Sequence, residues 1–161
     1  MRPRLWLPLL AALTCAGCPS AYQRTYDKEM AALEQQQQEK NAQQQALYAE
    51  ASKYAAVVYF AVGSAALDQD GYRQLTWFAD KLKPYPQANF LVQGFADSTG
   101  TEATNQQLSV DRAQAVAQFL VTQGIAMPRM DVQGFGITSP ADSNATAAGR
   151  RNNRRVEVTV R

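Results

Sequence analysis

The chain has 161 residues, 46% of them apolar and 19% charged, which suits one domain of ordinary size with an accessory segment. It contains no histidine and only two cysteines, Cys15 and Cys18. Ser-His-Asp and Cys-His nucleophile systems, histidine-based metal sites and four-cysteine zinc clusters are therefore excluded. The formal charge of +2 is small and does not predict a nucleic-acid partner.

The N-terminal residues have the pattern of a secreted lipoprotein. Two arginines precede an apolar run over residues 5–13, which is typical of a signal peptide and too short to span a membrane. Ala16 and Gly17 precede Cys18. Small residues before a cysteine resemble the bacterial lipobox, where cleavage leaves a lipid-bearing cysteine. We expect residues 1–17 to be removed as a signal peptide and Cys18 to carry the lipid.

The alternative is an ordinary secreted protein with a Cys15/Cys18 pair, and Cys15 occupies a position where the lipobox usually has leucine. Two cysteines three residues apart would close a loop too small to constrain the fold. Loss of the leader would remove Arg2 and Arg4, so that the sixteen basic residues fall to fourteen, the number of acidic residues. By analogy with lipoprotein sorting in Gram-negative bacteria, Pro19 rather than aspartate after Cys18 resembles an outer-membrane destination.

Residues 18–55 form a Gln-rich segment that contains no glycine. Gln, Glu, Lys and Ala favour a helix, and apolar residues recur there at an approximate spacing of three or four, at Tyr22, Tyr26, Met30, Leu33, Leu47, Ala51 and Tyr54. Polar residues at Gln37, Lys40 and Gln44 interrupt this stripe, so the sequence predicts a helix without a strong coiled coil. Such a helix would be a spacer of roughly 50 Å. A disordered polar tether is the alternative.

Residues 56–161 have the alternating pattern of a globular α/β domain. Pro84 and Gly124 stop two predicted helices, and Thr104 and Gln107 have the spacing of a capping box. Strands that alternate with helices predict a sandwich in which crossovers join consecutive strands. The predicted strands are residues 57–60, 89–93, 130–133 and 156–160, and the predicted helices are residues 68–83 and 102–123.

Arg112 lies on the inward stripe of the second predicted helix, four residues after Leu108 and four before Val116. A buried guanidinium without a partner is very costly, so Arg112 requires a carboxylate from the protein or from a ligand. Asp97 is the natural candidate, because it follows the second strand at the end of the sheet where ligands gather in α/β proteins. A purely structural Asp97–Arg112 salt bridge is the alternative.

The loop over residues 136–153 is long and rich in small polar residues. Loops of this length inside compact domains are usually functional or disordered. The loop region ends in four arginines within six residues, which suggest either an anion site or a solvated face: Arg150, Arg151, Arg154 and Arg155.

Together, these spaced motifs resemble the OmpA-like peptidoglycan-binding domain. They are residues 94–100, 105–113, 134–136 and 144–157. The domain occurs in peptidoglycan-associated lipoproteins, OmpA-type porins and MotB-type stator proteins, and the lipobox selects the first type. The resemblance implies a two-layer βαβαββ sandwich of the α/β (α+β) class.

The resemblance also implies a non-catalytic protein, without metal or cofactor, that binds the peptide stem of peptidoglycan at meso-diaminopimelate. Asp97 occupies the position of the aspartate that pairs with the ligand's ammonium, and Arg112 that of the arginine that pairs with its carboxylate. Asn105 and Arg154 align with further polar residues that line the site. Such a lipoprotein would face the periplasm and tether the outer membrane to the cell wall, with Tol-type envelope proteins as candidate partners.

The sequence departs from the family pattern at two places. Phe95 and Ala96 stand where the family usually has histidine and threonine, and apolar residues 61–63 follow Phe60 where it often has an aspartate and a polar residue. We therefore expect one side of the pocket to be less polar.

Two other functions remain open. In an interaction module of an envelope machine, such as a secretion system or a Tol-like complex, the Gln-rich helix would contact a protein partner. A cell-wall hydrolase would need a carboxylate pair such as Asp97 and Glu102. Arg112 would keep Asp97 ionised, and no second buried acid is evident, so the hydrolase is disfavoured.

Overall fold

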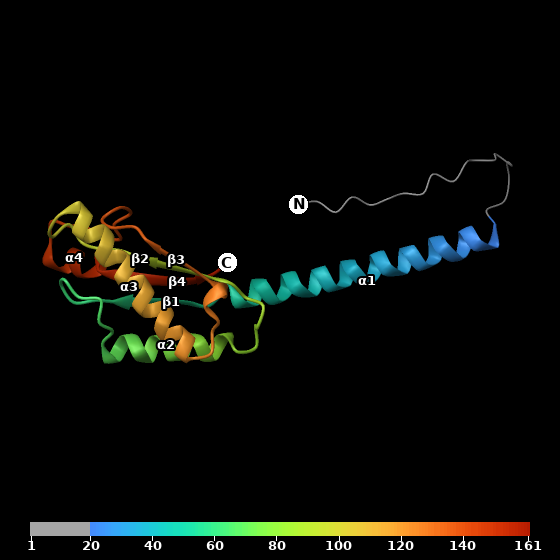
Figure 1. The fold of residues 1–161 in the computed structure, drawn as a ribbon, viewed down its shortest axis with the longest axis horizontal. Coiled ribbons are helices and arrows are strands. Elements are labelled where there is room, and N and C mark those ends of the chain that lie inside the picture. Colours follow the sequence, from blue (N-terminus) through green and yellow to red (C-terminus); the bar gives the residue numbers. More distant parts are fainter. Residues whose placement is uncertain (1–19) are drawn as a thin grey trace. The chain divides into compact units, whose positions relative to one another are not determined.

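The computed structural model describes residues 20–161, and the chain divides into two units, Met1–Ala42 and Gln43–Arg161. Helix α1 (Ala21–Ala51) begins where the Ser20 hydroxyl accepts a hydrogen bond from the backbone N–H of Gln23 at 3.2 Å (Figure 1). Side chains four residues apart bond along its surface, which stabilises an exposed helix: Gln23 with Asp27, Gln35 with Glu39 and Gln37 with Asn41. The helix predicted for the Gln-rich segment is present, and its role as a spacer stays a prediction.

Four strands form one sheet in the order β1-β4-β2-β3. They are β1 (Ala55–Tyr59), β2 (Phe90–Gly94), β3 (Met130–Gly134) and β4 (Arg155–Val160). β4 is antiparallel to both β1 and β2, whereas β2 and β3 are parallel. The last strand of the chain therefore lies between the first two, and its beginning meets the ends of both.

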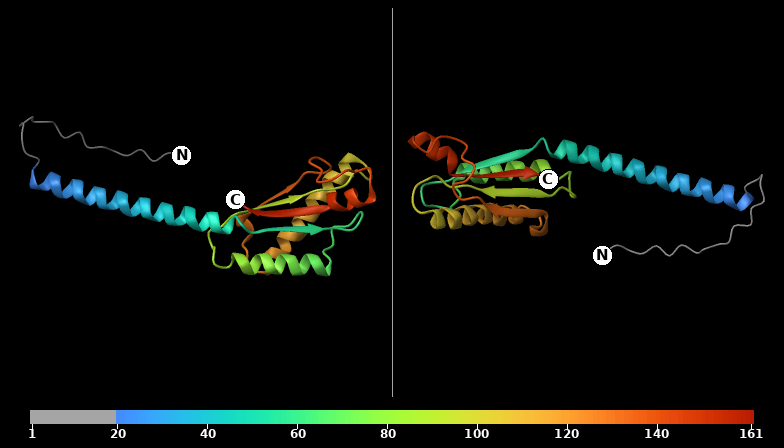
Figure 2. Two further views of the ribbon diagram at one scale, coloured as in Figure 1. Left: turned by 180° about the vertical axis from the view of Figure 1, so that it is seen from behind. Right: turned by 90° about the horizontal axis from the view of Figure 1, so that it is seen from above.

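Helices α2 (Gln69–Leu82) and α3 (Glu102–Thr122) pack on one face of this sheet; in the left view of Figure 2 the strands lie in front of α3. Alternate strand residues and one stripe of each helix form the core, and burial of each large apolar side chain contributes about 1.5–3 kcal/mol. The fully buried apolar residues include Val58, Leu75, Phe78, Phe90, Val92, Val116, Leu120, Val156 and Val158. The predicted two-layer sandwich is confirmed.

Two local expectations need correction. Thr101, rather than Thr104, is the N-cap of α3, because the Thr101 hydroxyl accepts a hydrogen bond from the backbone N–H of Thr104 at 3.2 Å. The long polar loop contains a short helix, α4 (Ala147–Asn153), which Thr146 caps by accepting a hydrogen bond from the N–H of Gly149 at 2.9 Å.

A short 3-10 helix (Met127–Arg129) precedes β3. Within residues 20–161, no helix combines the length and the apolar character that a membrane span requires.

Candidate functional site

The candidate site lies at the carboxyl ends of β1 and β2, where α3 approaches the sheet closely. Gly94 and Gly134 face each other in the β2–β3 register, and both adjoin Ser109 of α3. A Cβ on Gly94 would lie 2.0 Å from the Ser109 carbonyl oxygen, and one on Gly134 would lie 2.6 Å from the Ser109 hydroxyl oxygen. Only glycine permits this approach. Arg112 follows Ser109 by one helical turn, so it reaches the ends of the strands.

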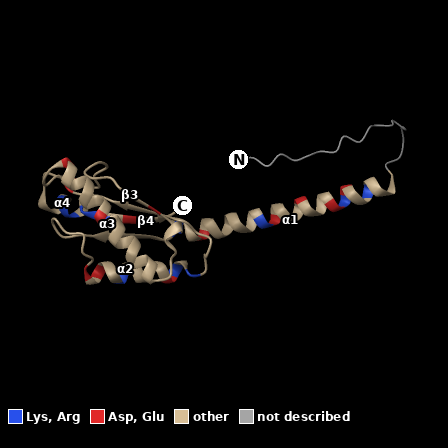
Figure 3. Cartoon of the chain, in the orientation of Figure 1, with Lys and Arg blue, Asp and Glu red and all other residues tan. Residues whose placement is uncertain are grey.

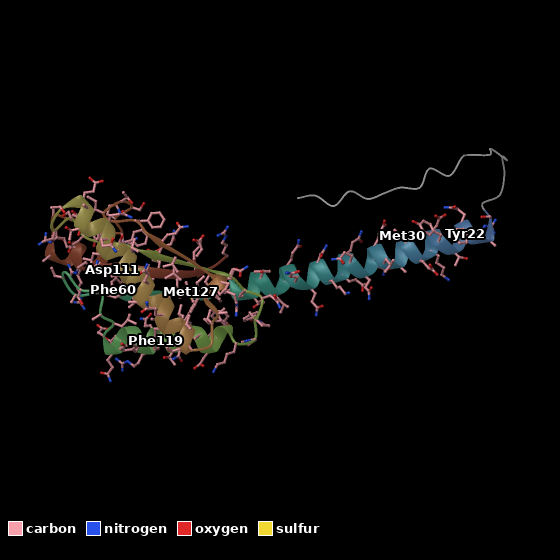
Figure 4. The ribbon with its side chains drawn as sticks, in the orientation of Figure 1. Tyr22, Met30, Phe60, Asp111, Phe119 and Met127 are labelled. Carbon is pink, nitrogen blue, oxygen red and sulfur yellow. The ribbon has the colours of Figure 1, made fainter. Side chains whose placement is uncertain are left out.

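Arg112 is fully buried, at 0% exposure, and it is held by backbone carbonyls. Its Nε donates to the carbonyl oxygen of Ser64 at 2.8 Å, and its Nη1 to that of Phe95 at 3.0 Å. Its Nη2 donates to the carbonyl oxygen of Ala61 at 3.0 Å. The guanidinium also lies 5.4 Å from the ring centroid of Phe60, which is labelled in Figure 4. Arg112 thus fastens the loop after β1 to the end of β2.

Asp97 pairs with Arg154 across the same end of the sheet. Nη1 of Arg154 lies 2.8 Å from Oδ2 of Asp97, and the two side chains are only 12% and 6% exposed. The other carboxylate oxygen, Oδ1, accepts a hydrogen bond from the backbone N–H of Thr99 at 2.9 Å. Nε of Arg154 donates to the carbonyl oxygen of Phe60 at 3.0 Å. The beginning of β4 is thereby joined to the loops after β1 and β2.

Asp97, Arg112 and Arg154 together carry a net charge of +1. Burial alone would raise the pKa of the Asp97 carboxyl, but the hydrogen bonds from Arg154 and Thr99 and the charge of Arg154 hold that pKa below its ordinary value of 3.8. Burial, and to a lesser degree the charge of Arg154, lower the pKa of Arg112 to about 10, against the opposing effect of Asp97. The carboxyl of Asp97 and the guanidinium of Arg112 are therefore both ionised at neutral pH. A site of this kind favours an anionic or zwitterionic ligand.

Three asparagines shape the loops beside the charged groups. Asn105, at 3% exposure, donates its side-chain N–H to the carbonyl oxygen of Thr99 at 3.1 Å. The backbone N–H of Ser98 donates to Oδ1 of Asn144 at 3.1 Å. The same oxygen accepts from the side chain of the buried Asn153 at 2.9 Å. The loop that carries Asp97 is therefore tied to α3 and to the long polar loop.

Phe95, at the end of β2, contacts the aromatic ring of Phe135 and the guanidinium of Arg155. Its ring stacks on Phe135 with the centroids 5.4 Å apart and the planes at 17°, and the guanidinium of Arg155 lies 4.0 Å from its centroid. Nε of Arg155 pairs with Glu157 at 2.6 Å. Nη1 of Arg155 is buried and has no hydrogen-bond partner among the described residues. The residue that replaces the usual histidine is therefore a packing residue, and it stabilises the backbone that leads into Asp97.

The structure brings Asp97, Arg112 and Arg154 to one place, and Asn105 on α3 binds the loop that carries Asp97. Arg112 is buried as its position on the helix predicts. The expectation that Asp97 is its natural partner is wrong, because three backbone carbonyls bind Arg112 and Asp97 is bound by Arg154. Cys18 lies outside the described residues.

The four arginines near the end of the polar loop have separate roles, although Figure 3 shows basic positions gathered around α4. Arg150 donates to the carbonyl oxygen of Asn144 at 2.8 Å, and Arg154 binds Asp97. Arg155 is buried, and Arg151 is exposed. The cluster is therefore neither one anion site nor one solvated face. Sequence reasoning missed Asn144 and Asn153, for which the run of small polar residues was the available signal.

Comparison with known proteins finds relatives of this domain in sequence and in structure. A family model described as OmpA family matches residues 59–154, more than half of the chain. The Probable lipoprotein YiaD of Escherichia coli strain K12 is 45% identical over 103 residues, which are 64% of this chain and 47% of that protein. The Peptidoglycan-binding protein ArfA of Mycobacterium tuberculosis is 42% identical over 103 residues, which are 64% of this chain and 32% of that protein.

Among solved structures, the peptidoglycan-associated lipoprotein of Burkholderia pseudomallei superposes with a TM-score of 0.63 at 29% identity, covering 66% of this chain and 90% of that chain. The chain spans less than half of the length of the two curated relatives. The names of these relatives describe lipoproteins and a binding protein rather than enzymes, in agreement with the expectation of a non-catalytic domain.

Proposed function

The chain belongs to the OmpA family, and on that premise we propose that residues 56–161 bind peptidoglycan at the free zwitterionic end of diaminopimelate in its stem peptide. The observation that carries this proposal is the buried Asp97–Arg154 pair next to the carbonyl-bound Arg112. A free diaminopimelate end presents one ammonium and one carboxylate. The site offers one carboxylate and two guanidinium groups at the same end of the sheet.

The ligand's ammonium would bind at Asp97. The carboxylate of Asp97 accepts one hydrogen bond at each oxygen in the free domain, from Thr99 and from Arg154. An ionised carboxylate has about four lone-pair sites, so acceptor capacity remains for a second cation. Its pKa lies below the ordinary value, so it stays charged throughout the neutral range.

The ligand's carboxylate would lie toward Arg112 and Arg154. Among the described residues no carboxylate lies within salt-bridge distance of Arg112, so its charge is compensated only by carbonyl dipoles and by the nearby Asp97. A bound carboxylate would neutralise the surplus charge in a partly desolvated site, where the attraction is stronger than in water. Asn105 would hold the loop that carries Asp97 in the binding conformation.

A lipid on Cys18 would anchor the protein in the outer membrane, and residues 18–55 would act as the spacer that lets the domain reach the cell wall from the periplasmic side. Support for this arrangement comes from the lipobox-like sequence and from the lipoprotein relatives. Incorporation of labelled palmitate, abolished by Cys18→Ser, tests the anchor. Incorporation that survives Cys18→Ser would contradict it.

The binding proposal is tested by co-sedimentation of the purified full chain with peptidoglycan sacculi. Asp97→Asn and Arg154→Gln should each weaken binding about tenfold or more, because each removes one charge that the ligand needs. The matched controls are Asp131→Asn and Arg161→Gln, which break an exposed pair whose atoms lie 2.8 Å apart outside the site.

These control variants should bind sacculi like the parent chain. Melting curves separate a loss of binding from a loss of folding. The proposal is wrong if folded Asp97→Asn protein binds sacculi as tightly as the parent, or if the controls lose binding to the same extent.

A further inference from the structure

Helix α1 carries an exposed apolar stripe over its first three turns. Tyr22, Tyr26, Met30 and Leu33 are 78%, 49%, 38% and 58% exposed, and two of them are labelled in Figure 4. Their spacing of four, four and three residues places them on one side of the helix. Four large apolar side chains in a continuous stripe exceed the scattered exposure that is normal for a surface.

Acidic residues lie beside this stripe, and basic residues lie on the opposite side of the helix. At about 100° per residue, Asp27 and Glu34 flank one side of the stripe and Glu29 flanks the other. The two bases of this segment, Arg24 and Lys28, fall on the opposite side of the helix. Figure 3 shows these acidic and basic positions along α1. The stripe therefore has a negative border.

A second copy of this helix fits the stripe poorly. In a parallel, in-register pair, Glu29 would lie opposite Glu34 of the second copy, and such like-charge contacts across a coiled coil are destabilising. Polar residues at Gln37, Lys40 and Gln44 also interrupt the same stripe beyond Leu33. An anionic lipid surface would be repelled by the same acidic border.

We infer that the stripe of Tyr22, Tyr26, Met30 and Leu33 docks an amphipathic helix of another protein whose apolar face is bordered by Lys and Arg. The apolar side chains provide the contact area, and the acidic border selects a basic partner and its orientation. This interaction is independent of the peptidoglycan site, because it uses side chains of the first unit alone.

The first test measures binding of the purified full chain to a designed helical peptide of about three heptads, with Leu at its core positions and Lys at its flanking positions. A second peptide carries Glu at the flanks. The Lys peptide should bind about tenfold more tightly than the Glu peptide. The double variant Glu29→Lys with Glu34→Lys should reverse this preference, and Met30→Ser should weaken both complexes.

The matched control is Gln35→Lys with Ala42→Lys, which introduces the same number of lysines on the face away from the stripe. It should change the affinity by less than about threefold. Circular dichroism verifies that each variant keeps its helix. Equal affinity for the two peptides, or an equal effect of the control and the Glu29/Glu34 variant, would overturn the inference.

The second test identifies the occupant in cells. A photo-reactive amino acid in place of Met30 should cross-link to a protein segment that mass spectrometry shows to be amphipathic and bordered by Lys and Arg. The same probe in place of Gln35 should not. Cross-links from Met30 to lipid, to a second copy of this chain or to a segment without basic flanks would contradict the inference, as would the absence of any cross-link above the Gln35 background.

Discussion

The two ends of β2 each hold an arginine through backbone carbonyls, but the two arginines differ in their burial and in their charged neighbours. At the carboxyl end, Arg112 donates to three backbone carbonyls and lies over the ring of Phe60. At the amino end, Arg129 donates to the carbonyls of Ala88 and Tyr85, at 2.8 and 3.0 Å, and lies 5.1 Å from the ring centroid of Phe90. Burial lowers the pKa of both arginines.

The difference lies in what surrounds each guanidinium. Arg112 is fully buried next to the Asp97–Arg154 pair, whereas Arg129 is partly exposed and has no salt-bridge partner within the part of the chain that the structure describes. Hydrogen bonds from an arginine to backbone carbonyls therefore stabilise loops, and by themselves they do not indicate a ligand site. The buried charge surplus around Asp97 is what distinguishes the candidate site.

The largest expected difference between Arg112 and Arg129 is in their contribution to stability. Arg112→Met should lower the free energy of unfolding by about 3–5 kcal/mol, because it removes three hydrogen bonds of a fully buried guanidinium and Asp97 loses a nearby positive charge. Arg129→Met should cost only about 1–2 kcal/mol, since it removes two hydrogen bonds of a guanidinium that is itself partly exposed to water. Urea unfolding of the two variants measures both values. Equal losses would remove the distinction between the two ends.

The second prediction concerns how the contribution of Asp97 to the free energy of unfolding depends on pH. Because the folded-state pKa of Asp97 lies below its ordinary value of 3.8, ionised Asp97 stabilises the fold at all pH values above that ordinary value. This contribution is lost as the pH falls through 3.8 and then through the lower folded-state pKa. The free energy of unfolding of Asp97→Asn should therefore be about 1–2 kcal/mol below that of the parent at neutral pH.

That difference should shrink toward zero in acid, and denaturant titrations between pH 7 and the acid limit of folding follow it. The control Asp131→Asn, in an exposed pair, should show a difference below about 0.5 kcal/mol throughout. A stability difference for Asp97→Asn that grows in acid would contradict the assigned sign.

The smallest expected effect concerns the stack of Phe95 on Phe135. Phe95→Leu keeps an apolar side chain but removes the stack on Phe135 and the contact with Arg155, so it should destabilise the domain by about 1 kcal/mol. Binding of sacculi should change less than about threefold, because Phe95 only supports the backbone next to Asp97. Thermal unfolding and co-sedimentation measure the two quantities. A tenfold loss of binding in a stable Phe95→Leu protein would make Phe95 part of the binding surface.

Much of the fold could be predicted from periodicity. The second helix stripe placed Arg112 inward, and Arg112 is fully buried. The predicted strand over residues 130–133 is β3, Met130–Gly134. These elements could be found because apolar spacing and stop residues act locally. Helix α4 was missed, since its seven residues, from Ala147 to Asn153, contain too few apolar positions to show a period.

The partners within the site could not be predicted from side-chain chemistry. Arg112 was expected to need a carboxylate, but backbone carbonyls of Ala61, Ser64 and Phe95 satisfy it. Every residue has a carbonyl, so no sequence signal marks the three that turn toward a guanidinium. The pairing of Asp97 with Arg154 depends on β4 lying between β1 and β2, which only the sheet order reveals.

We expect the site formed by Asp97, Arg112 and Arg154 to bind a zwitterion. The most direct measurement is calorimetric titration of the full chain with a stem peptide that ends in free diaminopimelate and with the same peptide amidated at that carboxylate. The free peptide should bind about tenfold or more tightly than the amidated one, and Asp97→Asn should weaken the binding of the free peptide. Equal affinity for the two peptides, or undiminished binding by Asp97→Asn, would contradict this expectation.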